Sequence, residues 1–230
     1  MDAKGNTYVI IVASGSGSRF GSELPKQYCQ LNGKPLLMTT IERIGAALPA
    51  SARILLAINH DHEPLWNNLC REYRFTSPIY YYGGDSRWAS VKNVIEHISP
   101  EEDDIIMVHD GARPVIFPEM MMRIIQMAHN HDGVIPAAKI SDSLRIVDTD
   151  GIRSHPIDRN TVRAVQTPQA FKAVLLKKAY EIPYRDTFTD DASVMSAAGH
   201  HDIVLVDGDT RNIKVTMPDD IKIASLYLAQ

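Results

Sequence analysis

The chain has 230 residues and a formal net charge of −4, with 44% of its residues hydrophobic and 23% charged. Such a composition is typical of a soluble globular protein with a substantial core, and the mild acidity excludes a protein that coats nucleic acid through general basicity. Two cysteines, Cys29 and Cys70, cannot form a multi-disulfide framework, and no apolar run approaches the roughly 18 residues that span a bilayer. We therefore expect one cytoplasmic domain over residues 1–230, with neither membrane nor nucleic acid as a partner.

Short β-branched runs alternate with segments of helical period along the chain. The predicted strands cover residues 8–13, 53–58, 79–82, 104–109, 133–138 and 203–207. The first contains Val9-Ile10-Ile11-Val12, a continuous apolar run that is typical of a strand covered by helices on both faces. The alternation predicts an α/β fold of Rossmann-like type, in which helices sandwich a mostly parallel sheet.

Two helices have clear signals in the sequence. Residues 118–131 carry apolar side chains at helical spacing on one face. Near the end of the chain, Thr216 and Asp219 place a hydroxyl and a carboxylate three residues apart. This spacing predicts the N-terminus of a last helix that runs to Leu228.

Residues 139–165 interrupt the alternation of strands and helices. Short alternating runs lie on either side of the turn signal Asp148-Thr149-Asp150-Gly151. They predict a β-hairpin that projects from the sheet as an arm, and an exposed loop is the alternative. The apolar residues of such an arm need a partner surface, which a second copy of the chain can supply.

The strongest local motif follows the first predicted strand. It reads Ala13-Ser14-Gly15-Ser16-Gly17-Ser18-Arg19-Phe20 and is followed by Pro25-Lys26-Gln27-Tyr28. Small residues let backbone amides approach an anion, and Arg19 and Lys26 add two cations, so the motif indicates a polyphosphate site. Phe20 stands where the dinucleotide fingerprint needs a third glycine, and no Gly-Lys-Ser/Thr string of a P-loop occurs.

Two further motifs follow predicted strands. Gly83-Gly84-Asp85 begins a turn that leads into a helical segment, and by itself it is read equally well as a turn with a helix cap. His109-Asp110-Gly111-Ala112-Arg113-Pro114 ends a buried-looking strand. An aspartate there can hold a ribose hydroxyl or a divalent cation, and a nearby arginine can clamp a phosphate. The alternative is a self-satisfying pair of Asp110 and Arg113.

Taken in order, these motifs resemble the cytidylyltransferase family that acts on 2-C-methyl-D-erythritol 4-phosphate in non-mevalonate isoprenoid synthesis. The resemblance covers about residues 8–228. Besides the motifs above, it rests on Ser90 and on three later blocks, Gln166-Thr167-Pro168-Gln169, Thr189-Asp190-Asp191-Ala192-Ser193 and Asn212-Ile213-Lys214-Val215-Thr216.

The resemblance implies a role for each matching residue. The implied nucleotide-binding residues are Ala13, Ser14, Gly15, Gly17, Gly84, Asp85, Ser90, Asp110 and Gly111. Among them, Gly84, Asp85 and Ser90 would read cytosine, and Asp110 would lie close to a Mg²⁺ ion. The implied substrate-binding residues are Arg113, Ser143, Arg159, Thr167, Thr189 and Lys214, and the implied catalytic residues are Arg19, Lys26, Arg159 and Lys214.

The resemblance also implies the reaction and the assembly. A phosphate oxygen of 2-C-methyl-D-erythritol 4-phosphate would attack the α-phosphorus of CTP, giving 4-diphosphocytidyl-2-C-methyl-D-erythritol and pyrophosphate. Ser143 and Arg159, on the arm, would reach the neighbour's site in a homodimer. A cytidylyltransferase for ribitol 5-phosphate is the nearest alternative. A nucleotide-binding regulatory protein without chemistry and an NAD-dependent oxidoreductase are the others, and Phe20 counts against the oxidoreductase.

Overall fold

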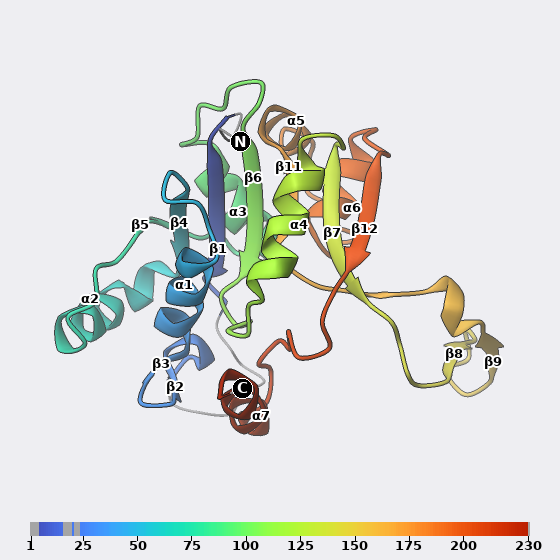
Figure 1. Cartoon of the computed structure of the whole chain (residues 1–230). Helices are drawn as coiled ribbons and strands as arrows, with labels where there is room; N and C mark the ends of the chain where they lie inside the picture. Colours follow the sequence, from blue (N-terminus) through green and yellow to red (C-terminus); the bar gives the residue numbers. More distant parts are fainter. Residues whose placement is uncertain (1–4, 16–19, 21–23, 230) are drawn as a thin grey trace.

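The computed structural model describes residues 5–15, 20 and 24–229. Its main sheet is built from β1 (Thr7–Ala13), β4 (Arg53–Ile58), β5 (Ile79–Tyr82), β6 (Ile105–Asp110), β7 (Gly133–Ala138), β10 (Ala164–Val165), β11 (Gln169–Lys172) and β12 (Ile203–Asp207). The strand order is β10-β7-β11-β6-β1-β4-β5, with β12 also paired to β7 (Figure 1). β10 and β11 are antiparallel to their neighbours, and the other pairs are parallel. The predicted mostly parallel sheet is therefore confirmed.

All six predicted strands are present. Four have the predicted bounds, and β1 and β6 differ from them by one residue at an end. The sequence reasoning missed β10 and β11, which are two and four residues long. β11 is rich in residues without β-branching, so its place between β6 and β7 comes from pairing with those strands rather than from its own preference.

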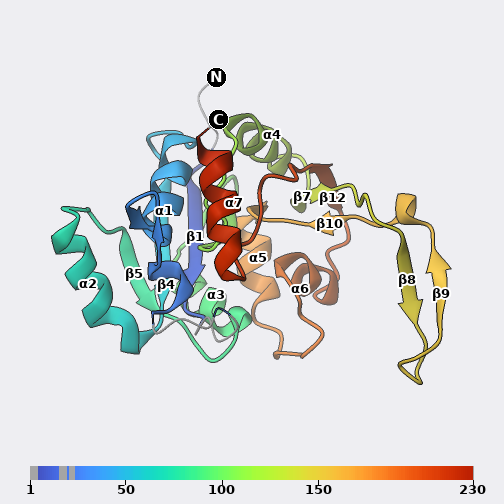
Figure 2. The same ribbon diagram turned by 90° about the horizontal axis from the view of Figure 1, so that it is seen from below.

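Helices cover both faces of the sheet. They are α1 (Leu36–Ala46), α2 (Glu63–Glu72), α3 (Arg87–Ile95), α4 (Pro118–Ala128), α5 (Ala173–Ala179), α6 (Asp191–Ala197) and α7 (Pro218–Leu228). Figure 2 shows α1 and α4 on one face and α3, α5 and α6 on the other. The sequence of β1 explains this, because Val9 and Ile11 pack into the core under α1, α2 and α4, whereas Ile10 packs into the core under α3, α5 and α6.

Short elements connect this framework. They are the 3₁₀ helices η2 (Lys26–Tyr28), η3 (His60–His62) and η4 (Arg159–Thr161) and the two-residue strands β2 (Gln30–Leu31) and β3 (Lys34–Pro35). β2 and α7 contact each other, and together with Phe20 they enclose a small apolar cluster that includes Val215 and Ala224. None of the described helices has both the length and the apolar character that a membrane span requires.

The two predicted helices form, but each differs in one detail. α4 ends at Ala128, three residues before the predicted end, because the Asn130 amide donates to the Met127 carbonyl in a tight turn. α7 begins as predicted, but the capping carboxylate is not Asp219. Asp220 instead accepts from the amides of Thr216 and Met217 at 2.7 and 2.8 Å.

The predicted hairpin is present as β8 (Leu144–Val147) and β9 (Ser154–Ile157), which form a separate two-stranded sheet. Figures 1 and 2 show that it extends well away from the main sheet. We call residues 139–163 the arm. Its apolar side chains are largely exposed, with 61% of Val147 and 88% of Ile152 accessible.

Candidate active site

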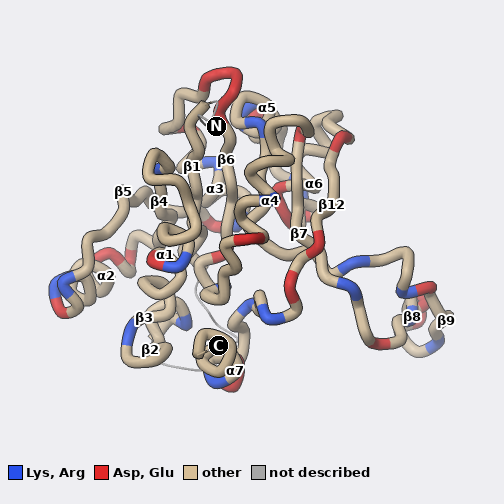
Figure 3. Tube along the Cα trace, in the orientation of Figure 1, with Lys and Arg blue, Asp and Glu red and all other residues tan. Residues whose placement is uncertain are grey.

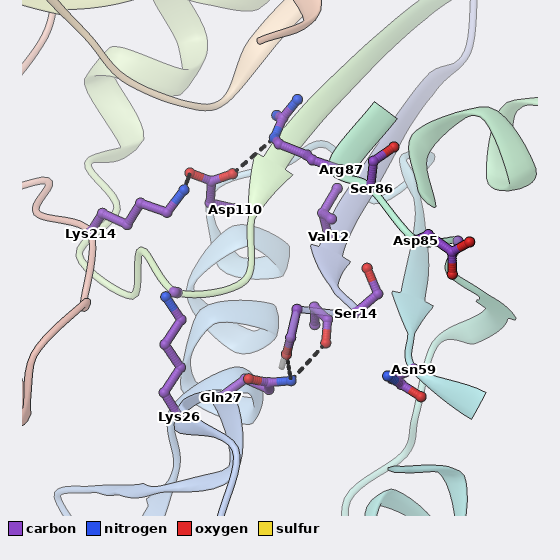
Figure 4. Close-up of a pocket in the computed structure, with 14 residues that line it drawn as sticks. Val12, Ser14, Lys26, Gln27, Asn59, Asp85, Ser86, Arg87, Asp110 and Lys214 are labelled. Carbon is purple, nitrogen blue, oxygen red and sulfur yellow. Dashed lines mark hydrogen bonds and ion pairs between the residues drawn. The ribbon is translucent and has the colours of Figure 1, made fainter. Parts of the chain in front are cut away.

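The carboxyl ends of β1, β4 and β6 meet at one edge of the sheet, because these strands are parallel. A cavity of about 430 Å³ lies there, which we call the first pocket (Figure 4). Its lining residues are Val12, Ala13, Ser14, Gly15, Lys26, Gln27, Asn59, Gly84, Asp85, Ser86, Arg87, Asp110, Ala112 and Lys214. Seven of the predicted nucleotide-binding and catalytic residues that the structure describes lie next to one another in its wall or are linked to it through Ser90.

The loop after β1 is fixed by a side chain that sequence reasoning had quoted without a role. The Gln27 side-chain amide donates to the carbonyls of Ala13 and Gly15, at 2.9 and 3.0 Å. This bracing holds the start of the loop at the pocket. Gly17 and Arg19, which were predicted to bind the nucleotide phosphates, lie outside the described residues.

Lys26 lies on η2 and lines the first pocket, as predicted. Its ammonium group donates to the carbonyl of Val215 at 3.0 Å, a residue 189 positions later in the chain. This contact ties the loop that carries Lys26 to the segment that carries Lys214. Two predicted catalytic lysines are thereby brought to the same cavity.

The loop from Gly83 to Ser90 packs closely against the loop after β1. A side-chain carbon at Gly83 would lie 2.3 Å from Cβ of Ser14, so only glycine fits there. The hydroxyls of Ser14 and Ser90 are 2.7 Å apart, and the Ser90 hydroxyl accepts from the Gly84 amide at 3.2 Å. Ser90 is fully buried and does not line the pocket, so it positions the loop.

The turn-and-cap interpretation of this segment is also correct. Ser86 is the N-cap of α3, and its hydroxyl accepts from the Ala89 amide at 3.0 Å. Asp85 and Ser86 nevertheless line the first pocket. The same short segment therefore ends a strand, caps a helix and forms one wall of the cavity.

A second pocket of about 250 Å³ adjoins the first. It is lined by Arg87, Asp110, Arg113, Val165, Gln166, Thr167, Gln169, Thr189, Asp190 and Lys214. The four predicted substrate-binding residues of the main body, Arg113, Thr167, Thr189 and Lys214, are all in this set. Three residues, Arg87, Asp110 and Lys214, line both pockets.

The two remaining predicted residues are elsewhere. Ser143 and Arg159 belong to the arm and line neither pocket. Ser143 is exposed, and the Arg159 guanidinium donates to the carbonyl of Ser141 within the arm. Within one copy of the chain, the structure therefore does not bring them to the pockets.

Asp110 lies at the boundary between the pockets and faces three cations. Its carboxylate is 2.9 Å from the Lys214 ammonium, 3.3 Å from Nε of Arg87 and 3.4 Å from Nε of Arg113. Burial alone would raise the pKa of Asp110, but the three cations together lower it well below its ordinary value. The predicted pair of Asp110 and Arg113 is thus one contact of a larger network.

The neighbours of Asp110 hold it in place. Thr167 Oγ1 accepts from the Asp110 amide at 3.0 Å and lies 3.1 Å from Nδ1 of His109. Burial lowers the pKa of His109 to about 4, so its ring is neutral near pH 7 and supports the backbone here. The Gly111 amide donates to the carbonyl of Val12, which joins this segment to β1.

Sequence reasoning assigned no role to Gln27, Asn59 or Arg87, although all three line the first pocket. One signal existed for Arg87. It is the first residue of α3, where a positive charge opposes the helix dipole, so a functional reason for an arginine could have been suspected. Asn59 caps η3 by accepting from the Asp61 amide, which a sequence does not distinguish from an ordinary turn.

The residues present suit a divalent cation only in part. Among the described residues, no group of three or more histidine, cysteine, aspartate or glutamate side chains is placed to hold a metal ion. Asp110 offers one carboxylate at the pocket boundary. Mg²⁺ is commonly bound by one or two carboxylates together with substrate phosphates, so this donor set fits an ion that arrives with a nucleotide.

Comparison with known proteins gives a consistent result. Residues 7–230 match the family model described as 2-C-methyl-D-erythritol 4-phosphate cytidylyltransferase. The chain is 39% identical to the enzyme of that name from Phocaeicola vulgatus, over 97% of this chain and 100% of that protein. It is 37% identical to the one from Porphyromonas gingivalis strain ATCC 33277, over 98% and 99% of the two chains.

Solved structures give the same result. The 4-diphosphocytidyl-2C-methyl-D-erythritol synthase of Anaerococcus prevotii superposes with a TM-score of 0.80 at 28% identity, covering 97% of this chain and 96% of that one. The 2-C-methyl-D-erythritol 4-phosphate cytidylyltransferase of Francisella tularensis superposes with a TM-score of 0.79 at 30% identity, covering 96% and 99%.

Proposed function

The chain belongs to the 2-C-methyl-D-erythritol 4-phosphate cytidylyltransferase family, and we propose from this premise how its two pockets share the reaction. The enzyme is a CTP-dependent nucleotidyltransferase that transfers CMP to 2-C-methyl-D-erythritol 4-phosphate and releases pyrophosphate. The first pocket holds CTP, and the second holds the phosphate of the acceptor. The observation that carries this division is the wall that the pockets share.

The shared wall fixes where the reaction occurs. The acceptor phosphate must reach the α-phosphorus of CTP in line with the leaving pyrophosphate, so the two anions meet at the boundary of their pockets. Arg87, Asp110 and Lys214 lie at this boundary (Figure 4). Since the acceptor phosphate is already an anion, the attack needs no general base, and the neutral, buried His109 is not required as one.

The main obstacle to the reaction is electrostatic. Two unit charges about 4 Å apart repel by about 4 kcal/mol at an effective dielectric constant of about 20, and several such pairs form here. Lys26 and Lys214 offset this repulsion from the walls of the first pocket, and Arg113 and Lys214 from the second. They also stabilise the charge that builds on the transferred phosphate. Arg19 is proposed to act with them.

Asp110 is the residue that would hold Mg²⁺. When bound, the ion supplies charge neutralisation for the CTP phosphates, which the lysines alone provide only in part. Lys214 and the two arginines around Asp110 keep its carboxylate ionised and therefore able to take a cation. Backbone groups of Ala13 to Gly15 and of Gly84, together with Asp85, are proposed to surround the nucleotide.

We further propose a homodimer, acting in the cytoplasm, in which each arm reaches the partner's second pocket. Two observations support it. The arm exposes apolar side chains that a monomer would leave in water, and its two predicted substrate-binding residues, Ser143 and Arg159, line neither pocket of their own chain. Basic residues also lie along the base of the arm, as anion binding requires (Figure 3).

The decisive experiment is a comparison of acceptors. The purified protein is incubated with CTP, Mg²⁺ and either 2-C-methyl-D-erythritol 4-phosphate or ribitol 5-phosphate, and the products are identified by mass spectrometry. We expect the cytidine diphosphate adduct of methylerythritol and stoichiometric pyrophosphate. Faster turnover of ribitol 5-phosphate would overturn the assignment of the acceptor, and tight CTP binding without any product would indicate a binding protein.

A further inference from the structure

A chain of polar contacts runs from the interior of the protein to the boundary of the two pockets. It begins at Tyr180 and Asp191, whose exposed fractions are 1% and 0%. The Tyr180 hydroxyl donates to Oδ1 of Asp191 at 2.6 Å, and Nη2 of Arg87 donates to Oδ2 at 2.7 Å. Both carboxylate oxygens of Asp191 are therefore used to hold other side chains.

The same arginine continues the chain toward the pockets. Nε of Arg87 donates to Oδ1 of Asp110 at 3.3 Å, and the Lys214 ammonium is 2.9 Å from Oδ2 of Asp110 (Figure 4). The contacts thus lead from Tyr180 through Asp191, Arg87 and Asp110 to Lys214. Its last three members are the residues that both pockets share.

Stability alone gives no reason for this arrangement. A buried ion pair gains little net stability, because removing the two charges from water offsets most of their attraction. Arg87 is in addition the first residue of α3, where the helix dipole disfavours a positive charge. Asp191 is the first residue of α6, and its side chain points to Arg87 and Tyr180 rather than to the amides of its own helix, which Asp190 caps.

The geometry of the arginine suits a role in orientation. The guanidinium group is planar and presents its N–H donors in a fixed fork, so it can bind two carboxylates at once and set the angle between them. The two carboxylates come from different elements, because Asp110 ends β6 and Asp191 begins α6. A lysine at this position would keep the charge but lose the fork.

We propose that Arg87 is a positioning residue for the transfer reaction: anchored by Asp191 and Tyr180, it orients Asp110, which in turn holds the Lys214 ammonium at the boundary between the pockets. The inference rests on the proposed roles of the two pockets. Arg87 acts through Asp110 and Lys214, so its loss should impair the chemical step more than the binding of CTP.

The test uses two conservative variants of the full-length enzyme. For Arg87→Lys we expect kcat to fall by about tenfold or more, since small displacements of reacting groups are costly, while the Kd for CTP from calorimetry changes by less than about twofold. For Tyr180→Phe, which removes only the hydroxyl at the far end of the chain, we expect a smaller fall in kcat. The double variant should be no slower than Arg87→Lys alone, because both changes break one chain of contacts.

A matched control separates positioning from stability. Leu176 is fully buried on α5, and Leu176→Ala lowers Tm without removing any of these polar contacts. At a temperature where it is folded, its kcat should equal that of the wild type. Equal losses of kcat in Leu176→Ala and Tyr180→Phe variants of similar Tm would overturn the proposal.

The remaining outcomes are equally clear. An unchanged kcat in Arg87→Lys shows that charge at this position suffices and overturns the positioning role. A loss confined to CTP affinity would make Arg87 a binding residue instead. A wild-type enzyme that forms no cytidine diphosphate product would refute the proposed function, whereas an active wild type with a fully active Arg87→Lys variant refutes only this inference.

Discussion

The tightest contact between the two loops that form the first pocket is made by an atom that is absent. Gly83 leaves room for Ser14, and a side-chain carbon there would come within 2.3 Å of Cβ of Ser14 and 2.7 Å of the hydroxyls of Ser14 and Ser90. Those hydroxyls are 2.7 Å apart and link the loop after β1 to the loop that follows β5. The shape of the nucleotide pocket therefore depends on a glycine that does not line it.

We expect Gly83→Ala to weaken CTP binding by about tenfold or more, because the added methyl group forces the two loops apart. Overpacking of this kind also costs about 1–3 kcal/mol of stability. Calorimetric titration with CTP and urea unfolding measure the two effects. The control is Gly45→Ala on α1, where the new carbon would lie 3.7 Å from Ile54, an ordinary contact. CTP affinity equal to the wild type in Gly83→Ala would contradict the prediction.

At the scale of elements, the start of α7 offers a direct comparison between two adjacent aspartates. Asp220 accepts from the amides of Thr216 and Met217 and from the Thr216 hydroxyl, at 2.7 to 2.9 Å. Asp219 only pairs with Lys222, and both of these side chains are more than 80% exposed. α7 closes the apolar cluster beneath the loop of Lys26, so its first turn supports the site.

We predict that Asp220→Ala lowers the free energy of unfolding by about 1 kcal/mol, the usual cost of losing a helix cap, and that Asp219→Ala changes it by less than about 0.5 kcal/mol. Burial raises the pKa of Asp220, but the amides of Met217 and Thr216 and the Thr216 hydroxyl lower it overall. A depressed carboxyl pKa contributes stability above its unfolded value of about 4, which is lost as the pH falls through the folded value. The difference between wild type and Asp220→Ala should therefore shrink below about pH 4, and denaturant unfolding at several pH values would reveal a constant difference if the cap were unimportant.

The same helix shows what local sequence can and cannot determine. A hydroxyl, a proline and acidic residues within one turn locate the start of α7, but only the folded backbone decides that Asp220 rather than Asp219 is in reach. The long apolar strands were predictable for a related reason, because burial on both faces leaves a continuous apolar run. β10 and β11 carry no such run and are specified by their neighbours.

The site follows the same division. Residues in compact motifs, such as Ser14, Asp85 and Asp110, were identified because small, acidic and basic residues after strands indicate phosphate chemistry. Arg87 was not, since its role depends on Asp191, which lies 104 positions later and reaches it only when α6 packs beside α3. Motifs therefore predict which loops form the pocket, and tertiary packing decides which side chains control it.

At the scale of the whole molecule, the arm is the feature that a single chain does not explain. It projects from the main sheet and exposes Val147 and Ile152. We expect Ile152→Asp to convert a dimer into monomers at micromolar concentration, measured by light scattering on a sizing column. The control is Ile79→Asp on the edge strand β5, where 67% of the side chain is exposed, and this variant should remain a dimer. A wild-type protein that is monomeric at every concentration would refute the proposed assembly.

Hybrid dimers test whether the arm completes the partner's site. Lys26→Ala and Arg159→Ala should each reduce activity severely, because each removes a cation from every site. After subunit exchange, half of the dimers are mixed, and one of the two sites in each mixed dimer has both residues, so about a quarter of the wild-type activity should return. Mixing Lys26→Ala with the double variant should restore nothing. If the first mixture also stays inactive, the arm serves its own chain or no site at all.

The way in which the arm joins the sheet suggests a use beyond assembly. Ala138 and Ala164, at its two ends, are directly paired in the ladder of β7 and β10, a spacing of about 5 Å that a tight turn can bridge. Everything between them makes its strand pairs within itself. The arm is thus a detachable module, and replacing it with a two-residue turn would give a minimal nucleotide-binding core on which arms of different specificity could be grafted.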